Sequence, residues 1–261
     1  MKKTFDNIFT SADGSIVVDN DFLVIVDAGC EQRTVKDFIK ISKKENKPIA
    51  YIFLTHFHWD HVLNTKVFRN YFPELITIGH KNNYAAGMKV DDKTLTIGSF
   101  EYETIQTPGH SPRMDDICIL LKDRGVLFTG DLCQPQGKSF KSVDFVTPVP
   151  CFTNGERYIE SLKKILGLEF KIMITGHGQV YRERSARNAL RITLKTVEAM
   201  KKAGVKLSKK DLSGRDLADM IFKEVSEERG FDSDSRMSTD DYEEIDLPGL
   251  MYWARFARKR A

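Results

Sequence analysis

The sequence of 261 residues predicts a mixed α/β or α+β fold in which sheets and helices form layers. Short strand-like runs dominate the first half of the chain, helical patterns separate the later strands, and only helical patterns follow about residue 182. A sheet and an amphipathic helix each carry an apolar face that must be covered. A chain that mixes the two therefore folds into a layered core.

The strand-like runs pair across short polar turns. The runs SIVV and FLVIVDAG flank the turn DND, and the runs TLTI and FEYETIQ flank Gly98 and Ser99. ICILLK and VLFTG flank the turn DRG at 123–125. PIAYIFL is apolar throughout, as expected for a strand that is buried on both faces, and KIMIT is a further strand. We therefore expect three hairpins and at least one fully covered strand.

Helices are indicated by apolar spacing and by the residues that begin and end helices. The stretch VLNTKVFRNYF, after residue 61, has a helical pattern. Asn154 is an N-cap for the helix ERYIESLKKIL, which ends at Gly167. A long amphipathic helix repeats apolar residues at three- and four-residue steps from Ala186 to Met200, and it is expected to end near Gly204.

The last part of the chain is predicted to contain helices and one polar segment. Ser213 and Asp216 form a capping-box pattern before a further helix. Residues 230–246 are polar and acidic, which indicates a loop or a mobile lid. The tail LPGLMYWARFARKRA predicts a last helix that packs Leu250, Trp253 and Phe256. We therefore divide the chain into a core, residues 1–182, and a helical C-terminal extension, residues 183–261, that could act as a lid.

Composition and charge exclude several classes of protein. The chain is 41% hydrophobic and 30% charged, which is enough apolar material for a sizeable core and too much for a disordered chain. The net charge of +3 comes from 40 basic and 37 acidic residues, a near balance that gives no reason to expect nucleic acid or an anionic membrane as a partner. No apolar run approaches the ~18 residues that span a bilayer. Neither nucleic acid nor a membrane is therefore expected; the expected partner is a small-molecule substrate, which could be anionic, and the oligomeric state is left open.

The start of the chain and the cysteines indicate the cytoplasm. MKKTFDNIFTSADGS has two lysines but no apolar stretch behind them, so we expect no signal peptide. The four cysteines form no CxxC pair and no disulfide-like framework. We expect them to be reduced thiols, as is usual in cytoplasmic proteins. Cys133 is expected to be a buried thiol.

Histidines gather at the ends of predicted strands. The motif THFHWDH, at 55–61, directly follows the strand AYIFL and holds three of the six histidines. Other polar residues follow the strands FEYETIQ, VLFT and KIMIT through short turns, at points where loops carry chemistry on a rigid scaffold. Only His80 lies away from such an end, and we expect it to be a loop or core histidine. The residues at strand ends are His56, His58, Asp60, His61, His110, Asp131 and His177.

These residue types predict a metal centre. Histidine and carboxylate are the ligands preferred by zinc and similar ions, and gathering so many rings costs energy unless something binds them. A catalytic zinc takes about three protein ligands plus a water, so five histidines and two aspartates suit two ions that share a bridging carboxylate. Between two ions ~3.5–4 Å apart, a bridging water loses its proton near neutral pH and becomes a nucleophile. Zinc is the favoured ion, with iron or manganese as alternatives, because the same ligands accept all three.

The set of motifs resembles the metallo-beta-lactamase superfamily across roughly residues 10–182. The HxHxDH cluster, the GH at His110, the TGD at Asp131 and the TGHG at His177 have the order and spacing of that family. All ligand positions are filled, as in its glyoxalase II-like and lactonase-like members. The resemblance implies a four-layer αβ/βα sandwich, a catalytic core over residues 1–182 and metals at one edge of the two sheets.

The resemblance also implies a role for each residue. One ion would be held by three histidines, the other by one aspartate and two histidines, and Asp131 would bridge them. Asp60 would also orient the attacking hydroxide, which makes Asp60 and Asp131 the candidate catalytic residues. By resemblance the first set is His56, His58 and His110, and the second is Asp60, His61 and His177.

Two departures from the family pattern bear on the substrate. β-Lactamases of the commonest type have a cysteine where this chain has Asp131, so we do not expect antibiotic hydrolysis. Many relatives read GHTPGS where this chain reads GHSPRM, which places Arg113 where a glycine is common. Arg113 either directs a cation at the site and favours an anionic substrate, or is a solvated loop residue. Trp59, between the ligands, is a candidate for the pocket wall, opposite the loop from Cys133 to Phe152.

The leading hypothesis is hydrolysis of an ester-type bond, in a thioester, a lactone or a phosphodiester, by a bridging hydroxide on two metals. The alternative is a sulfur dioxygenase of the same fold, in which one iron is held by His56, His110 and Asp131. A third hypothesis is a metal-bearing scaffold that binds a partner through the C-terminal helices. Metal identity and oxygen consumption separate the first two, and absence of turnover would favour the third.

Overall fold

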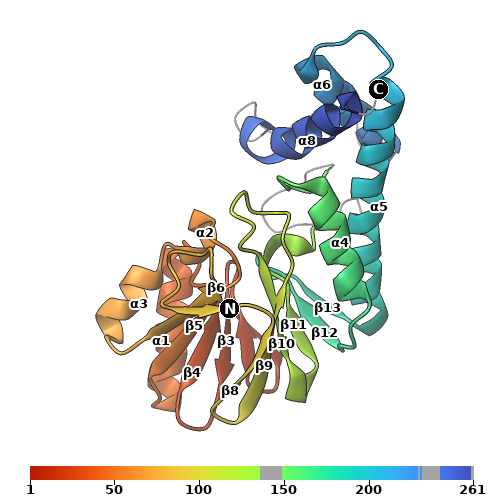
Figure 1. The fold of residues 1–261 in the computed structure, drawn as a ribbon. Helices are drawn as coiled ribbons and strands as arrows, with labels where there is room; N and C mark the ends of the chain where they lie inside the picture. Colours follow the sequence, from red (N-terminus) through yellow and green to blue (C-terminus); the bar gives the residue numbers. More distant parts are fainter. Residues whose placement is uncertain (136–148, 229, 231–241, 260–261) are drawn as a thin grey trace. The chain divides into compact units, whose positions relative to one another are not determined.

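The computed structural model describes residues 1–135, 149–228, 230 and 242–259 (Figure 1). The chain forms two compact units, each discontinuous in sequence. The first consists of Met1–Leu132 with Glu169–Ala186, and the second of Cys133–Leu168 with Arg187–Ala261. The division at residue 182 into a catalytic core and a lid-like extension stays a prediction.

The first sheet of the first unit changes from antiparallel to parallel pairing along its width. Neighbours from β1 to β4 pair antiparallel, and neighbours from β4 to β7 pair parallel. The predicted SIVV–FLVIV hairpin is confirmed as β3–β4, and PIAYIFL is confirmed as a strand, β5, between two neighbours. In spatial order the strands are β1 (Lys2–Phe5), β2 (Ile8–Thr10), β3 (Ser15–Val18), β4 (Leu23–Val26), β5 (Ile49–Leu54), β6 (Ile76–His80) and β7 (Met88–Val90).

The second sheet contains the other two predicted hairpins. β8 pairs with β9 and β10 with β11, both antiparallel, and KIMIT supplies β12, which pairs parallel with β11. The turn at Lys122–Arg124 is one 3₁₀ turn. In sequence order the strands are β8 (Lys93–Ile97), β9 (Phe100–Gln106), β10 (Ile117–Leu121), β11 (Val126–Phe128), β12 (Ile172–Ile174) and β13 (Val180–Arg182).

Successive side chains of a strand point to opposite faces of the sheet, and they build two apolar cores in the first unit. Val24 and Val26 lie in the core between the two sheets, whereas Ile25, between them in sequence, lies on the outer face of the first sheet. That outer face is covered by α1 (Gln32–Glu45) and α3 (Thr65–Tyr71), which lie beside β4 and β5 in Figure 1. Strands covered on both faces read as continuous apolar runs, which explains the sequences LVIV and IAYIFL. The predicted mixed α/β fold of two sheets and helices is confirmed.

The second unit, over its described residues, consists of helices. As predicted, the side chain of Asn154 accepts a hydrogen bond from the N–H of Arg157, and Ser213 and Asp216 bond reciprocally at the start of α6. Leu250 and Trp253 are buried and Phe256 is half-buried. The helices are α4 (Gly155–Leu166), α5 (Glu183–Leu207, whose first turn belongs to the first unit), α6 (Gly214–Glu228), the π-helical turn Tyr242–Asp246 and α8 (Leu247–Arg258).

Two helix predictions need correction. The long helix α5 ends at Leu207, three residues beyond the predicted end near Gly204, and Gly204 itself lies against the backbone of Trp253. VLNTKVFRNYF is not one helix: α2 (Trp59–Val62) and α3 are separate, since the N–H of Asn64 bonds to the carbonyl of Gly29. Most of the acidic segment 230–246 lies outside the described residues. None of the described helices is long and apolar enough to cross a membrane.

Candidate metal centre

The strand directions of the first unit bring the polar strand ends together. β9 and β11 both run antiparallel to β10, and β12 runs parallel to β11, so the carboxyl ends of β9, β11 and β12 emerge at one edge of the second sheet. His110, Asp131 and His177 follow these three ends. The HxHxDH motif follows β5 of the first sheet. The structure gathers all seven predicted residues into two groups.

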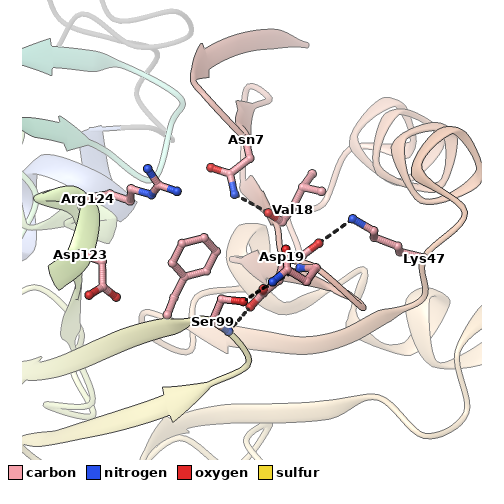
Figure 2. Close-up of a pocket in the computed structure, with 9 residues that line it drawn as sticks. Asn7, Val18, Asp19, Lys47, Ser99, Asp123 and Arg124 are labelled. Atoms are coloured by element: carbon pink, nitrogen blue, oxygen red, sulfur yellow. Dashed lines mark hydrogen bonds between the residues drawn. The ribbon is translucent and has the colours of Figure 1, made fainter.

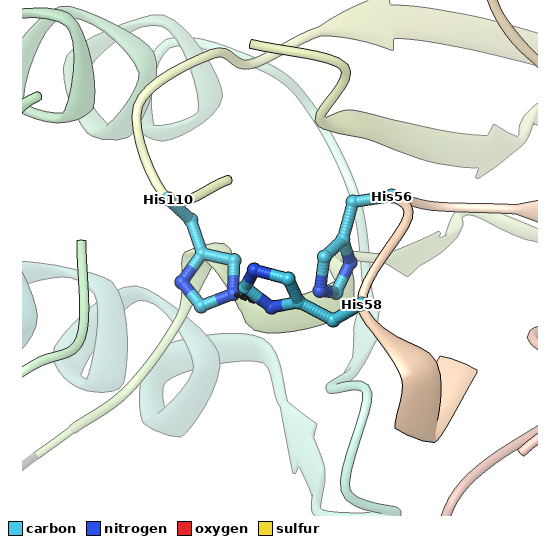
Figure 3. Close-up of side chains that lie close together, drawn as sticks. All are labelled: His56, His58 and His110. Atoms are coloured by element: carbon cyan, nitrogen blue, oxygen red, sulfur yellow. Dashed lines mark hydrogen bonds between the residues drawn. The ribbon is translucent and has the colours of Figure 1, made fainter. Parts of the chain in front are cut away.

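The first group consists of three histidines, His56, His58 and His110, whose ligand nitrogens lie within 4.8 Å of one another. Figure 3 shows the three rings converging from two different loops. Nε2 of His110 shares a hydrogen bond of 3.0 Å with Nδ1 of His58, and the ring of His56 lies edge-on to both. Three imidazole nitrogens that point at one spot form one face of a tetrahedral ligand set.

The second group consists of Asp60, His61, Asp131 and His177, and its ligand atoms also lie within 4.8 Å of one another. One oxygen of Asp131, Oδ1, lies 3.5 Å from Nε2 of His61, and the other, Oδ2, lies 3.3 Å from Nε2 of His177. The same Oδ2 lies 3.6 Å from Nε2 of His110, which belongs to the first group. Asp131 therefore touches both groups.

Burial favours the neutral form of two histidines of the first group, His56 and His58. It lowers the pKa of His56 well below the ordinary value, and the neighbouring rings of His61 and His110 lower this pKa further. Burial also lowers the pKa of His58 to about 3, with His110 adding to the shift. Since a metal binds the neutral imidazole, the rings are in the form that a cation requires.

The second group attracts positive charge. Burial acts to lower the pKa of His61, but the carboxylates of Asp131 and Asp27 outweigh it and raise this pKa well above its ordinary value. Burial acts to raise the pKa of Asp131, but His177 and His61 outweigh it and hold this pKa well below its usual range. An ionised carboxylate among buried rings is stable only beside a cation, either a proton on a ring or a metal ion.

The donor set fits a metal on two structural grounds. Nε2 of His56 and Nε2 of His61 are buried and have no hydrogen-bond partner among the described residues, whereas Nδ1 of each ring bonds to Thr55 and Asp27 respectively. Buried polar atoms without a partner are rare unless a ligand satisfies them. Gly176 lies so close that a Cβ there would collide with Asp131 and His61, so the second group needs a residue without a side chain at this position.

Asp27 is a site residue that the sequence analysis missed. It follows β4, is buried and has a left-handed backbone with φ of 60°. Its carboxylate accepts hydrogen bonds of 2.8 Å from both the N–H and the hydroxyl of Thr55, and one of 2.9 Å from Nδ1 of His61. A carboxylate on the far nitrogen fixes the orientation of a ligand histidine. The signal was present in the sequence, because Asp27 follows a strand as the other site residues do.

Asp116 plays a comparable part for the loop that carries His110. Its carboxylate accepts hydrogen bonds of 3.1 Å from the N–H of Gly109 and 2.9 Å from the N–H of Ser111, on either side of His110 in the chain. Burial raises the pKa of Asp116 to about 6. This second missed aspartate precedes a strand, so the strand-end rule would not have found it.

The other predicted positions lie outside the two groups. His80 is buried in β6, where Nε2 bonds to Oε1 of Gln106 at 3.0 Å. Cys133 is buried, as predicted. Trp59 begins α2 and is 67% exposed, and the opposite wall expected from the loop 133–152 lies mostly outside the described residues. Arg113 lies over the rings of Phe57 and Tyr84.

A cavity of about 560 Å³ lies at the other edge of the sheets (Figure 2). Its residues precede the strands whose far ends carry the site: Asn20 lies before β4, Lys47 before β5 and Ser99 before β9. The carboxylate of Asp19 accepts hydrogen bonds from the N–H groups of Asn20 and Ser99, and Nζ of Lys47 donates to the carbonyl of Asp19. These four residues therefore bond to one another along the wall of the cavity.

A model of one protein family matches most of the first unit. The metallo-beta-lactamase superfamily model covers residues 11–177, a range that contains Asp27 and all seven residues of the two groups. The chain belongs to this superfamily. The resemblance predicted from the motifs is thereby confirmed.

Curated relatives of this superfamily member include hydrolases. A probable metallo-hydrolase of Methanocaldococcus jannaschii is 30% identical over 167 residues, which are 62% of this chain and 74% of that protein. An atrochrysone carboxyl ACP thioesterase of Aspergillus fumigatus is 26% identical over 149 residues, which are 56% of this chain and 32% of that protein. The chain spans less than half the length of the first fungal relatives that it matches.

Solved structures of the superfamily share the fold. A metallo-beta-lactamase family protein from Thermus thermophilus matches with a TM-score of 0.67 at 13% identity, over 97% of this chain and 93% of that one. At such an identity the likeness shows the fold alone. The predicted fold of the metallo-beta-lactamase type is confirmed.

Proposed function

We propose that the protein is a metal-dependent hydrolase that cleaves ester-type bonds, with thioesters ahead of lactones and phosphodiesters. The observation that carries the proposal is the pair of adjoining ligand groups with Asp131 in contact with both. The thioesterase among the relatives supports thioesters as the first class to test. Asp131 in place of a cysteine argues against β-lactam antibiotics as substrates.

Each group would hold one divalent ion, and zinc is the ion that suits these nitrogen and oxygen donors best. When bound, such ions polarise a carbonyl or phosphoryl oxygen and lower the pKa of a water to near neutrality. The first ion would take His56, His58 and His110. The second would take Asp60, His61 and His177, and Asp131 would reach both.

The residues of the chain supply orientation and a proton acceptor. Oδ2 of Asp60 lies 3.6 Å from Nε2 of His61 and 3.8 Å from Nε2 of His177, and 24% of the Asp60 side chain is open to solvent. The other oxygen of Asp60 would orient the attacking water and accept its proton. Asp27 holds His61 from behind, so the ring does not turn while the reaction proceeds.

A second candidate is the sulfur dioxygenase chemistry of a single iron. The observation in its favour is that His110 and Asp131 lie 3.6 Å apart beside His56, which forms a trio of two histidines and one carboxylate. The second group also has a full set of candidate ligands, which favours the hydrolase because the dioxygenase needs only one ion. The metal itself distinguishes the two, because the dioxygenase needs one iron.

We also propose a cytoplasmic location and a small-molecule substrate, with no role for a membrane or nucleic acid. The four cysteines, all of them described and none in a disulfide, support the location, since thiols stay reduced in the cytoplasm. Fractionation of cells that express the protein tests the location. Recovery with an exported or membrane fraction would contradict it.

The test of the function is metal content per chain by elemental mass spectrometry, on protein purified without chelators or a metal-affinity tag. About two zinc or similar ions per chain, with turnover of a thioester, lactone or phosphodiester, is the expected result. About one iron per chain with uptake of oxygen would support the dioxygenase instead. Two ions without turnover of any of the three classes would overturn the hydrolase.

Two single-residue variants test the assignment of Asp131 as a metal ligand. Asp131→Ala should lower metal content and abolish turnover together, because Asp131 contacts both groups. His80→Ala is the control: it removes another buried histidine and the two hydrogen bonds of its ring, to Gln106 and to the N–H of Asn82, at a cost of about 2 kcal/mol of stability, and should leave metal content unchanged. Full metal loading in Asp131→Ala would contradict the assignment.

A further inference from the structure

The guanidinium group of Arg113 is stacked on two aromatic rings. Its Cζ lies 4.4 Å from the ring centre of Tyr84 and 5.1 Å from that of Phe57, and the two rings pack against each other. A cation over the face of an aromatic ring is attracted by the ring's electrons. The stack leaves the edge of the planar guanidinium, with its N–H donors, available to a ligand.

The backbone of Arg113 is also held in place, by two hydrogen bonds. The carbonyl of Arg113 accepts a hydrogen bond of 3.1 Å from Nδ2 of Asn82, in the turn that also carries Tyr84. The N–H of Arg113 donates to the hydroxyl of Ser111 at 3.2 Å. Met114, the next residue, has a φ of 53°, in the left-handed region that is unfavourable for a non-glycine residue. The loop therefore keeps an unfavourable conformation that presents Arg113.

The charge of Arg113 is not neutralised by the protein. Among the described residues no carboxylate forms an ion pair with it. Lys81, in the neighbouring turn, does have such a partner, Asp91, at 3.3 Å. Arg113 and Tyr84 are both exposed, with 61% of Tyr84 open to solvent. A rigid and unpaired arginine on the surface is suited to bind an anion from solution.

Two members of the stack lie close in sequence to the first ligand group. Phe57 lies in the chain between His56 and His58, and Arg113 follows His110 by three residues. Phe57 and Arg113 therefore lie on the two loops that carry the three histidines, and Tyr84 lies in the turn after β6.

We propose that Arg113, on its platform of Tyr84 and Phe57, is a subsite for a carboxylate of the substrate, and that the enzyme selects esters or thioesters that carry a second, anionic end. This proposal rests on the proposed hydrolysis. A planar carboxylate can accept two parallel hydrogen bonds from the guanidinium edge, which a neutral group of the same shape cannot match. The fixed loop and rings reduce the ordering that binding requires.

The experiment compares two substrates of the same shape. One is the N-acetylcysteamine thioester of glutarate, and the other replaces its free carboxylate by a primary amide. The unaltered protein should favour the carboxylate in kcat/KM by about 10- to 100-fold, the range of hydrogen bonds to charged groups. Arg113→Gln should bring the ratio near one, chiefly through KM. Lys81→Gln, which removes a nearby paired cation, should leave the ratio unchanged.

Binding of analogues that cannot be hydrolysed tests the carboxylate subsite separately from the proposed hydrolysis. Ketones in which a CH₂ group replaces the thioester sulfur are not hydrolysed, and their binding is measured by calorimetry on the metal-loaded protein. Turnover of both substrates with equal binding of both analogues would overturn the subsite and keep the hydrolase. Turnover of neither, with the carboxylate analogue preferred and the preference lost in Arg113→Gln, would overturn thioester hydrolysis and keep the subsite.

Discussion

Single residues outside the ligand set fix the orientation of the ligand side chains. His56 and His61 each bond through Nδ1 to a neighbour, Thr55 or Asp27, and turn Nε2 to the site. Without that second bond either nitrogen of an imidazole could carry the proton, and the ring could rotate. Asp27 also bonds to Thr55, so one buried carboxylate steadies the loop at the start of the HxHxDH motif.

Asp27→Asn should weaken metal binding at the second group by about 10- to 100-fold, because the loss of the charge behind His61 lowers its basicity and its hold on orientation. Titration with a competing chelator measures the affinity. Asp13→Asn is the matched control: Asp13 is also a buried aspartate that accepts backbone hydrogen bonds, from Cys30 and Glu31, and it contacts no ligand residue. Equal affinity in Asp27→Asn and the unaltered protein would contradict the role of Asp27.

At the scale of elements, the turns after the strands are shaped to bring side chains close. Gly130 has a φ of 50° and precedes Asp131, and a Cβ there would collide with Thr55. Gly176 precedes His177, and its N–H bonds to the carbonyl of Gly130 at 2.9 Å. The turns after β11 and β12 are thus joined to each other, and this bond sets Asp131 and His177 side by side.

Gly176→Ala should lower metal affinity by about 10- to 100-fold, since an added methyl group against Asp131 and His61 has the ~1–3 kcal/mol cost of overpacking. Metal content after dialysis against a weak chelator measures the effect. Gly87→Ala is the control, because a Cβ at that position would lie 3.5 Å from the hydroxyl of Thr77, an ordinary contact. Loss of metal in both variants alike would show a general effect of glycine replacement and contradict the steric argument.

At the scale of the whole molecule, the fold brings together residues that lie far apart in the sequence. The ligands span from His56 to His177 and come from both sheets of the first unit. In the unfolded chain these residues do not form a common site. A metal ion that binds only the native state therefore stabilises it, and the stabilisation grows with the ratio of metal concentration to Kd.

Removal of metal should lower the thermal stability of the protein. At a metal concentration about one hundred times Kd, the stabilisation is about 2.7 kcal/mol, which corresponds to a Tm shift of about 5–10 °C in a domain of this size. Calorimetry before and after treatment with EDTA measures the shift, and added zinc should restore it. A Tm that EDTA leaves unchanged would contradict a metal site that forms on folding.

Much of the local structure could be predicted from residue patterns. The three hairpins follow from alternating apolar runs around polar turns, and the starts of α4 and α6 follow from capping residues whose bonds are local. One error arose where a distant contact prevailed over a local preference, since Asn64 bonds to Gly29 and interrupts a helical pattern. The other placed the end of α5 three residues early, near Gly204.

The sequence by itself determined the candidate donor set of the site, because histidine and aspartate at strand ends are recognisable without coordinates. Only the tertiary structure decided how these donors divide into two groups with Asp131 in contact with both. It also decided that Asp27 supports His61 and that Arg113 lies on Tyr84 and Phe57. The physical reason is that these contacts depend on strand order and loop conformation, which bring together residues that local patterns cannot relate.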